Sequence, residues 1–308
     1  MKVLITGASG FIGKNFLLKA PKDWKIFAFY NSSSDFPDFI KENSLSNTTP
    51  VKCDLLEKEQ IKTFFSSNND FDVCLYLAAN ANPTISVQDP KLDFDLNVTA
   101  LINFLTYFKG KKLIFFSSGA VYDGIKGPAK GKPLDPKLPY AISKLAAEQY
   151  INFFHKERHD FSNYVILRFF GAYGPHEPER KIYSQLVRSF GIEKNHEFTI
   201  RGDGTNLIDA MFIDDAIEGI LKIIESERTS NKVIDFCIGN PLTIKELILE
   251  AAKTFGINNP DIITQGTTAE PISFIGSSKE MKEICNFTPK TSLSDGLKIL
   301  KDFCEKTA

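Results

Sequence analysis

Apolar and polar positions follow two different periods at the start of the chain. Residues 3–6 form a short apolar run, a glycine-rich turn follows, and Phe11, Ile12, Phe16 and Leu17 then recur at helical spacing. A short apolar run bounded by turn residues is typical of a buried strand, whereas apolar side chains three and four residues apart are typical of a helix. The N-terminus therefore predicts a strand, a tight turn and a helix.

The same alternation continues along the chain. Further apolar runs predict strands at residues 26–30, 51–54, 73–77, 113–117 and 233–238, with helical patterns between several of them. A helix is also predicted at residues 243–255, with Thr243 as its N-cap and Glu246 three residues later. Strands that alternate with helices form parallel sheets covered on both faces. We therefore expect an α/β protein with a doubly wound parallel sheet.

Two long helical patterns are apolar nearly all round. They cover residues 92–108 and 140–154. One face of each helix would pack on the sheet, and a second face could form a subunit contact. The sequence therefore predicts a homodimer built on these two helices.

Composition and charge exclude several classes of protein. The 37 basic and 38 acidic side chains leave a formal charge of -1, which offers no electrostatic basis for binding nucleic acid. No apolar run approaches the roughly 20 residues that span a membrane. The five cysteines form no Cys-x-x-Cys pair, and His155 and His159 have no third ligand nearby, so no disulfide framework and no metal site is predicted. We expect a soluble protein of the reducing cytoplasm.

The glycine turn after the first apolar run is the first sign of chemistry. Gly7, Gly10 and Gly13 are spaced three apart between the predicted strand and helix. Such glycines let backbone amides at a helix N-terminus approach a pyrophosphate with no side chain in the way. The spacing differs from Gly-x-Gly-x-x-Gly, and the alternative is a structural turn with a helix-packing glycine. We favour a dinucleotide site of the Rossmann type.

The length of 308 residues exceeds the usual size of one domain. After Arg168 the chain becomes richer in glycine, proline and charged loops. We therefore expect a dinucleotide-binding domain at residues 1–168, to which residues 205–240 return. A smaller, mixed substrate-binding lobe would comprise residues 169–204 and 241–308.

The end of the second predicted strand bears on the choice of cofactor. An acidic residue there normally binds the adenosine ribose of NAD. Here the chain has Tyr30 and Asn31, followed by Ser32, so no carboxylate would repel the 2′-phosphate of NADP. The residues favour NADP slightly over NAD. Asp54, just past the third strand, is placed either to accept from the adenine amino group or to act as an ordinary turn carboxylate.

Three further residues fit carbonyl and alcohol chemistry. Tyr140 and Lys144 are four apart, so on a helix both project to one side, while Ser118 directly follows the fifth apolar run. A free phenol titrates near pH 10, and lowering its pKa by about three units requires about 4 kcal/mol. We expect the ammonium and a positive nicotinamide ring to supply this, so that Tyr140 acts as the base and Ser118 holds the reacting oxygen.

The motifs taken together resemble the extended short-chain dehydrogenase/reductase family, which includes nucleotide-sugar epimerases and dehydratases. The resemblance spans nearly the whole chain. Its motifs are Thr6-Gly7-Ala8-Ser9-Gly10-Phe11-Ile12-Gly13, Leu77-Ala78-Ala79, Asn97-Val98, Ser117-Ser118-Gly119-Ala120-Val121-Tyr122, Tyr140-Ala141-Ile142-Ser143-Lys144, Gly171-Ala172-Tyr173-Gly174-Pro175 and Gly202-Asp203-Gly204.

The resemblance implies NAD(P) as the cofactor and assigns Ser118, Tyr140 and Lys144 as catalytic residues. The residues expected to bind the cofactor come from both halves of the dinucleotide site. They are Gly7, Ser9, Gly10, Phe11, Ile12, Gly13, Asn31, Ser32, Asp54, Leu55, Leu77, Ala78, Ala79, Asn97, Tyr140, Lys144 and Phe170.

The resemblance also implies the reaction. Tyr140 would remove a proton from a sugar hydroxyl while hydride passes to the nicotinamide, which leaves a 4-keto sugar. A sugar-nucleotide epimerase would return the hydride to the other face of this intermediate. The alternative is an NADPH-dependent reductase of 4-keto sugars or related carbonyls. A third class, less expected, is a regulatory protein that binds the dinucleotide without catalysis.

Departures from the family pattern narrow the substrate. Dehydratases carry an acidic pair after the serine, whereas this chain has Gly119 and Ala120, so we do not expect elimination of water. Arginines that commonly clamp a diphosphate are replaced by Ile208 and are missing around residues 270–272, and Gly171 replaces a common asparagine. The substrate is either a nucleotide sugar bound by other cations or a smaller polyol-like ketone. The candidate cations are Arg180, Lys181, Arg188 and Arg201.

Overall fold

The computed structural model describes residues 1–266 and 271–307. The chain divides into two compact units. The first unit consists of Met1–Asp123, Pro133–Phe169 and Leu221–Asp235, and the second of Gly124–Lys132, Phe170–Ile220 and Phe236–Ala308. The domain boundaries expected from the sequence stay a prediction.

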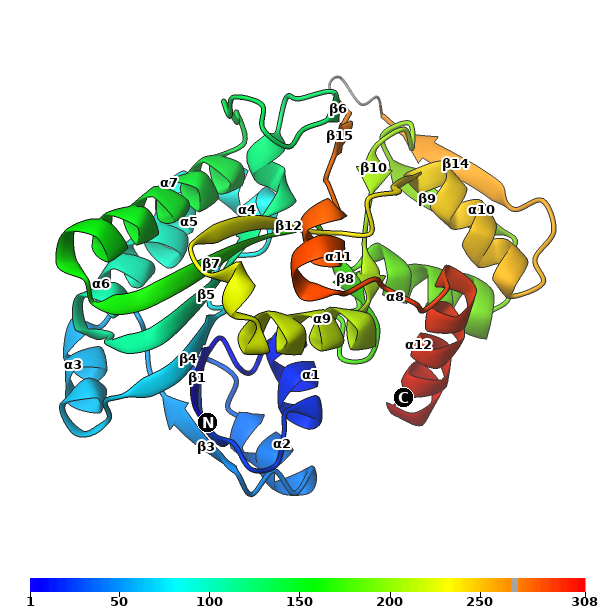
Figure 1. Ribbon diagram of the computed structural model, residues 1–308. Coiled ribbons are helices and arrows are strands. Elements are labelled where there is room, and N and C mark those ends of the chain that lie inside the picture. The colour runs from blue at the N-terminus through cyan, green and yellow to red at the C-terminus, as the bar shows by residue number, and fades with distance from the viewer. Residues whose placement is uncertain (267–270, 308) are drawn as a thin grey trace. The chain divides into compact units, whose positions relative to one another are not determined.

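A seven-stranded sheet forms the centre of the first unit, with the strand order β12-β7-β5-β4-β1-β2-β3 (Figure 1). The pairings of β1 with β2 and β4, of β2 with β3, of β4 with β5 and of β5 with β7 are all parallel. The expected doubly wound sheet is confirmed. Its strands are β1 (Lys2–Thr6), β2 (Lys25–Tyr30), β3 (Thr48–Lys52), β4 (Phe71–Tyr76), β5 (Gly110–Ser118), β7 (Phe161–Phe169) and β12 (Lys232–Phe236).

Helices cover both faces of this sheet. Its strands are therefore buried on both faces, which explains their continuous apolar runs. Val3, Leu4 and Ile5 in β1 are fully buried although neighbouring side chains point to opposite faces. On one face, Phe65 of α3 and Phe104 of α6 belong to an aromatic core. The helices of this unit are α1 (Phe11–Lys19), α2 (Phe36–Glu42), α3 (Lys58–Ser67), α4 (Pro83–Gln88), α5 (Pro90–Phe94), α6 (Ala100–Tyr107) and α7 (Pro139–Phe153).

Two local features differ from the sequence expectation. The helix expected at residues 92–108 is interrupted: α5 and α6 are joined by a π-helical turn, Asp95–Thr99. A wider turn of this kind is frequent at functional sites, and it brings Asn97 into the interior. In addition, β7 is a full strand of nine residues although Arg168 interrupts its apolar run.

The second unit contains small sheets and helices. The expected cap is present, because the Thr243 hydroxyl accepts from the Glu246 backbone N–H and the Glu246 carboxylate accepts from the Thr243 backbone N–H. The elements are β6 (Gly127–Pro128), β8 (Ala172–Tyr173), α8 (Ile182–Leu186), β9 (Glu197–Arg201), β10 (Leu207–Ile208), β11 (Met211–Phe212), β13 (Leu242–Thr243), α10 (Ile244–Thr254), β14 (Asp261–Gln265), β15 (Phe274–Ile275), α11 (Lys279–Cys285) and α12 (Leu293–Thr307). Helix α9 (Ile213–Glu225) has residues in both units.

Across residues 1–266 and 271–307, every helix is too short or too polar to cross a lipid bilayer.

Candidate active site

The glycine turn lies where the strand order of the sheet reverses. Strand β1 pairs with β2 on one side and with β4 on the other, and the turn follows β1 directly. Gly7 has a φ of +64°, and a Cβ on it would lie 2.8 Å from the backbone nitrogen of Ala78. A Cβ on Gly13 would lie 2.4 Å from the carbonyl oxygen of Ala8. Only glycine fits these two positions, and ligands of such sheets bind at this reversal.

The start of α1 is suited to an anion. Gly10 is its N-cap, no side chain caps the helix, and the first turn has no acidic residue. The first N–H groups of a helix lack partners within it and carry the positive end of its dipole. The residues Ser9, Phe11 and Ile12 belong to this turn and helix start. They fit the pyrophosphate of a dinucleotide, as the sequence predicts.

The residues expected at the adenosine end lie on two adjacent loops. Asn31 and Ser32 are exposed at the end of β2. The Asp54 carboxylate accepts from the Leu56 backbone N–H at 2.9 Å, so it forms a turn at the end of β3. Asn103 holds the same loop by donating to the carbonyl oxygens of Leu55 and Leu56 at 3.1 and 3.3 Å.

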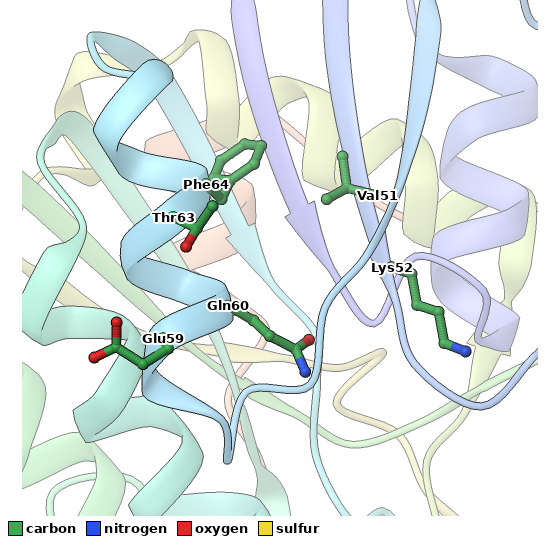
Figure 2. A pocket seen from close by; sticks show the side chains of 6 residues that line it. All are labelled: Val51, Lys52, Glu59, Gln60, Thr63 and Phe64. Atoms are coloured by element: carbon green, nitrogen blue, oxygen red, sulfur yellow. The ribbon is translucent and has the colours of Figure 1, made fainter.

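A surface pocket of about 510 Å³ lies beside this loop (Figure 2). Its lining includes neither the glycine turn nor Tyr140, so the pocket is separate from the predicted catalytic site. The Gln60 amide oxygen accepts from the Asp54 backbone N–H at 2.9 Å and thus connects the pocket to the loop. Its lining residues come from β3 and α3 and are Val51, Lys52, Glu59, Gln60, Thr63 and Phe64.

The structure brings Ser118, Tyr140 and Lys144 together in the first unit. Ser118 ends β5, and Tyr140 and Lys144 lie in the first two turns of α7. The Ser118 hydroxyl lies near enough to the Tyr140 phenol to act on its pKa as a hydrogen-bond partner. The buried Lys144 ammonium donates to the Phe116 carbonyl oxygen of β5 at 2.8 Å. These contacts join two elements that are far apart in the sequence.

Three influences act on the pKa of Tyr140 in the first unit. Burial raises the pKa of this phenol, a hydrogen bond from Ser118 lowers it, and the negative charge of Asp93 raises it. Lys144 is not among the causes, and its Nζ is bound to the β5 backbone. Burial in turn lowers the pKa of Lys144 to about 8, against the charges of Asp93 and Glu148. The expectation that the ammonium and a positive nicotinamide ring together lower the phenol pKa stays a prediction.

Sequence reasoning missed a buried ionic network next to this pair. Arg168 of β7 donates to both carboxylate oxygens of Glu148, at 3.1 and 2.8 Å, and to the Tyr122 hydroxyl at 2.9 Å. The Ser117 hydroxyl donates to Glu148 at 2.6 Å. Two signals were present: Glu148 lies one helical turn after Lys144, and Arg168 interrupts an apolar strand.

Comparison with known proteins agrees with this geometry. The sequence model of the NAD dependent epimerase/dehydratase family matches residues 3–239. The chain belongs to this family. The family expected from the sequence is thus confirmed, and with it the expectation of an NAD-dependent enzyme.

Relatives with similar sequences match nearly the whole chain. A UDP-glucuronate 4-epimerase of Thermodesulfobacterium geofontis is 27% identical over 96% of this chain and 93% of its own. An uncharacterized UDP-glucose epimerase of Bacillus subtilis is 26% identical over 96% of both chains. The crystal structure of a UDP-glucose 4-epimerase from Thermotoga maritima with UDP-glucose is 26% identical, covers 100% of this chain and 99% of its own, and has a TM-score of 0.87.

The remaining predicted residues fall into both units. Leu77, Ala78 and Ala79 follow β4, and the Ala78 backbone N–H donates to the Thr6 hydroxyl at 3.2 Å. Asn97 is buried in the π-helical turn, and Phe170 belongs to the second unit.

The candidate cations for a diphosphate all lie in the second unit. Arg188 forms an exposed ion pair with Glu179 at 3.1 Å, and Arg180, Lys181 and Arg201 are exposed. Ile208, at the position of a common arginine, is half-buried in β10. The second departure from the family pattern, the missing arginine around residues 270–272, falls partly on Glu270, which lies outside the described residues. The diphosphate clamp stays a prediction.

Proposed function

We propose that this protein is a sugar-nucleotide epimerase that uses NAD(P) and acts through transient oxidation of its substrate to a 4-keto intermediate. The observation that carries this proposal is the contact of the Ser118 hydroxyl with the Tyr140 phenol, next to the buried Lys144, in a chain of the epimerase/dehydratase family. Two of the relatives named above are UDP-sugar 4-epimerases and the third is a UDP-glucose epimerase, which favours epimerisation over the reductase alternative.

The side chains of this site have separate tasks in the proposed reaction. Tyr140 accepts the proton of the sugar hydroxyl and later returns it, and Ser118 hydrogen-bonds the same oxygen. Lys144 has donors left beyond its bond to Phe116, with which it would bind the ribose next to the nicotinamide. When bound, NAD(P) supplies the hydride acceptor and donor. Gly119 and Ala120 offer no acid for a leaving hydroxyl, so the site is not built for dehydration.

We also propose that the protein prefers NADP over NAD. This preference rests on Asn31 and Ser32 in place of a carboxylate. Lys14 of α1 adds a cation in this region, 3.7 Å from the exposed Asp35. Isothermal titration of the protein with both cofactors tests the preference. At least tenfold tighter binding of NAD would overturn it.

The catalytic proposal is tested by Tyr140→Phe, which removes the proton acceptor and keeps the ring. With UDP-glucose or UDP-glucuronate as the probe, we expect turnover to fall by a factor of about 10² to 10⁴ while NAD(P) binding persists. Tyr150→Phe, on an exposed position of the same helix, is the matched control and should retain full activity.

Two results would contradict parts of this proposal. Unchanged turnover in Tyr140→Phe with intact cofactor binding would favour the dinucleotide-sensing protein. Failure of every UDP-, GDP-, CDP- or dTDP-sugar to shift the melting temperature would favour a smaller polyol-like ketone as substrate.

We further propose that the protein is a homodimer of the cytoplasm. Helices α4, α5 and α7 pack against one another in the first unit and expose apolar side chains. The stripe on α7 consists of Ile142, Tyr150 and Phe153, which recur at helical spacing and are 39–50% exposed. All five cysteines are free thiols, which suits a reducing compartment.

A further inference from the structure

A buried polar cluster lies directly behind the catalytic pair, within the first unit. Asp93 of α5 is 1% exposed, and its Oδ1 accepts from the side-chain amides of Asn80 at 2.7 Å and Asn97 at 3.0 Å. The Asn97 amide also donates to the Ser143 hydroxyl at 3.0 Å. That hydroxyl donates to the Tyr140 carbonyl oxygen at 3.0 Å. A chain of hydrogen bonds therefore connects Asp93 to the first turn of α7.

This cluster is not fully satisfied. The Oδ2 of Asp93 and the Oδ1 of Asn97 are buried and have no hydrogen-bond partner among the described residues. A buried acceptor without a partner costs about 1 to 3 kcal/mol, and more when the group is charged. Folding alone would favour an apolar residue over Asp93, so the carboxylate calls for an explanation in the function of the site.

We propose that Asp93 is a positioning residue of the catalytic site, whose carboxylate orients Tyr140 through Asn97 and Ser143 and keeps the Lys144 side chain in its ammonium form. This inference deepens the function proposed above and rests on it. Asp93 touches neither Tyr140 nor Lys144 by a hydrogen bond of its own. It acts through the two intermediate side chains and through its charge.

The electrostatics of Lys144 support the second part of this role. Burial lowers the pKa of Lys144, and the negative charges of Asp93 on α5 and Glu148 on α7 raise it. The groups around its Nζ also include the Phe116 carbonyl oxygen of β5 and the Phe115 ring, 5.0 Å away. Glu148 is already engaged by Arg168 and Ser117. The carboxylate of Asp93, with one oxygen free of such bonds, is thus the less compensated charge.

The test uses Asp93→Asn, which keeps the shape and the accepting oxygen but removes the charge. Isothermal titration with NAD(P) between about pH 6 and 9 reports whether Lys144 carries its proton. Loss of a nearby negative charge disfavours the ammonium form of Lys144. As the pH rises, the affinity for NAD(P) should therefore fall about one pH unit earlier in the variant than in the unchanged protein. Lys144→Ala should bind weakly with no such pH dependence.

Asp95→Asn is the matched control for this experiment. Asp95 lies two residues away, and its charge is paired with Lys91 at the surface. Removal of the Asp95 charge should leave unchanged the midpoint pH of the fall in affinity for NAD(P). The same midpoint in Asp93→Asn and Asp95→Asn would overturn the role of the Asp93 charge.

Ser143→Ala tests the orienting contact separately and also serves if Asp93→Asn does not fold. It breaks the link between Asn97 and the Tyr140 carbonyl without changing any charge. We expect kcat to fall at least about tenfold with an unchanged midpoint of cofactor affinity. Turnover equal to that of the unchanged protein would contradict the link. Absence of NAD(P) binding in the unchanged protein would instead refute the proposed function, so the two failures are distinguishable.

Discussion

At the scale of one residue, the buried charge of Lys144 lowers the stability of the folded protein. The ammonium is buried, and one hydrogen bond to the Phe116 carbonyl replaces its hydration shell. Its pKa is lowered from 10.5 to about 8 because burial disfavours the charged form. At neutral pH the folded protein therefore holds a charge whose burial has a free-energy cost.

We predict that Lys144→Met stabilises the protein without cofactor at pH 7 by about 1 to 3 kcal/mol. Since the folded pKa lies below the unfolded one, the unchanged protein gains stability as pH rises from about 8 towards 10.5, and the advantage of the variant shrinks there. Urea unfolding at both ends of this range measures it. Lys62→Met, on an exposed position of α3, should change the free energy of unfolding by less than about 0.5 kcal/mol. A variant less stable than the unchanged protein at pH 7 would contradict this account.

At the scale of elements, one ionic network connects the parts that carry the site. Arg168 on β7 and Glu148 on α7 form a two-pronged ion pair, and the Tyr122 hydroxyl after β5 donates to Asp235 of β12 at 2.7 Å. The side chains of Arg168 and Glu148 are 12% and 3% exposed. Such a pair ties helix to sheet, but its net stabilisation is limited by the cost of removing both charges from water.

We predict that Arg168→Leu lowers the free energy of unfolding by about 3 to 5 kcal/mol, because Glu148 is left as an unpaired buried charge. The double variant Glu148→Leu with Arg168→Leu should regain a large part of this loss. Urea unfolding of the three proteins measures the difference. Lys111→Ala, which breaks the exposed pair with Asp72, should change stability little. A double variant no more stable than Arg168→Leu would show that the loss comes from packing.

At the scale of the whole molecule, the exposed apolar stripe on α7 points to a second copy of the chain. Neighbouring helices add Val87 on α4 and Leu92 and Phe94 on α5. Apolar patches of this kind on one face mark interfaces more often than free surface. A closed two-fold dimer would cover the same stripe on both copies.

We predict that Ile142→Glu combined with Phe153→Glu converts the proposed dimer into monomers. Glutamates at these positions would be desolvated on both copies, because a two-fold dimer buries the same surface of each, and burying unpaired charges is costly. Light scattering coupled to gel filtration measures the mass. Leu249→Glu, on an exposed position of α10, should leave the mass unchanged. A monomeric mass of the unchanged protein would contradict the dimer.

Much of the fold followed from local pattern. The alternation of strands and helices, the glycine turn and the spacing of Tyr140 and Lys144 depend on residues close together in the chain, whose periods and steric limits can be counted. For the same reason the capping box at Thr243 and Glu246 was predictable. The return of β12 to the sheet followed from one apolar run at residues 233–238.

Other features depended on contacts between distant segments. The burial that acts on the Tyr140 pKa and the bond of Lys144 to Phe116 could not be predicted, because helical spacing says nothing about either. Asp93 and Asn80 are ordinary polar residues until α5 and the loop after β4 bring them together.

The amino-acid sequence by itself determined the class of fold and the family, and it predicted which residues exchange a proton with a substrate. The tertiary structure alone decided how those residues are charged and held, because desolvation and long-range hydrogen bonds are properties of the packed chain and not of neighbours along it.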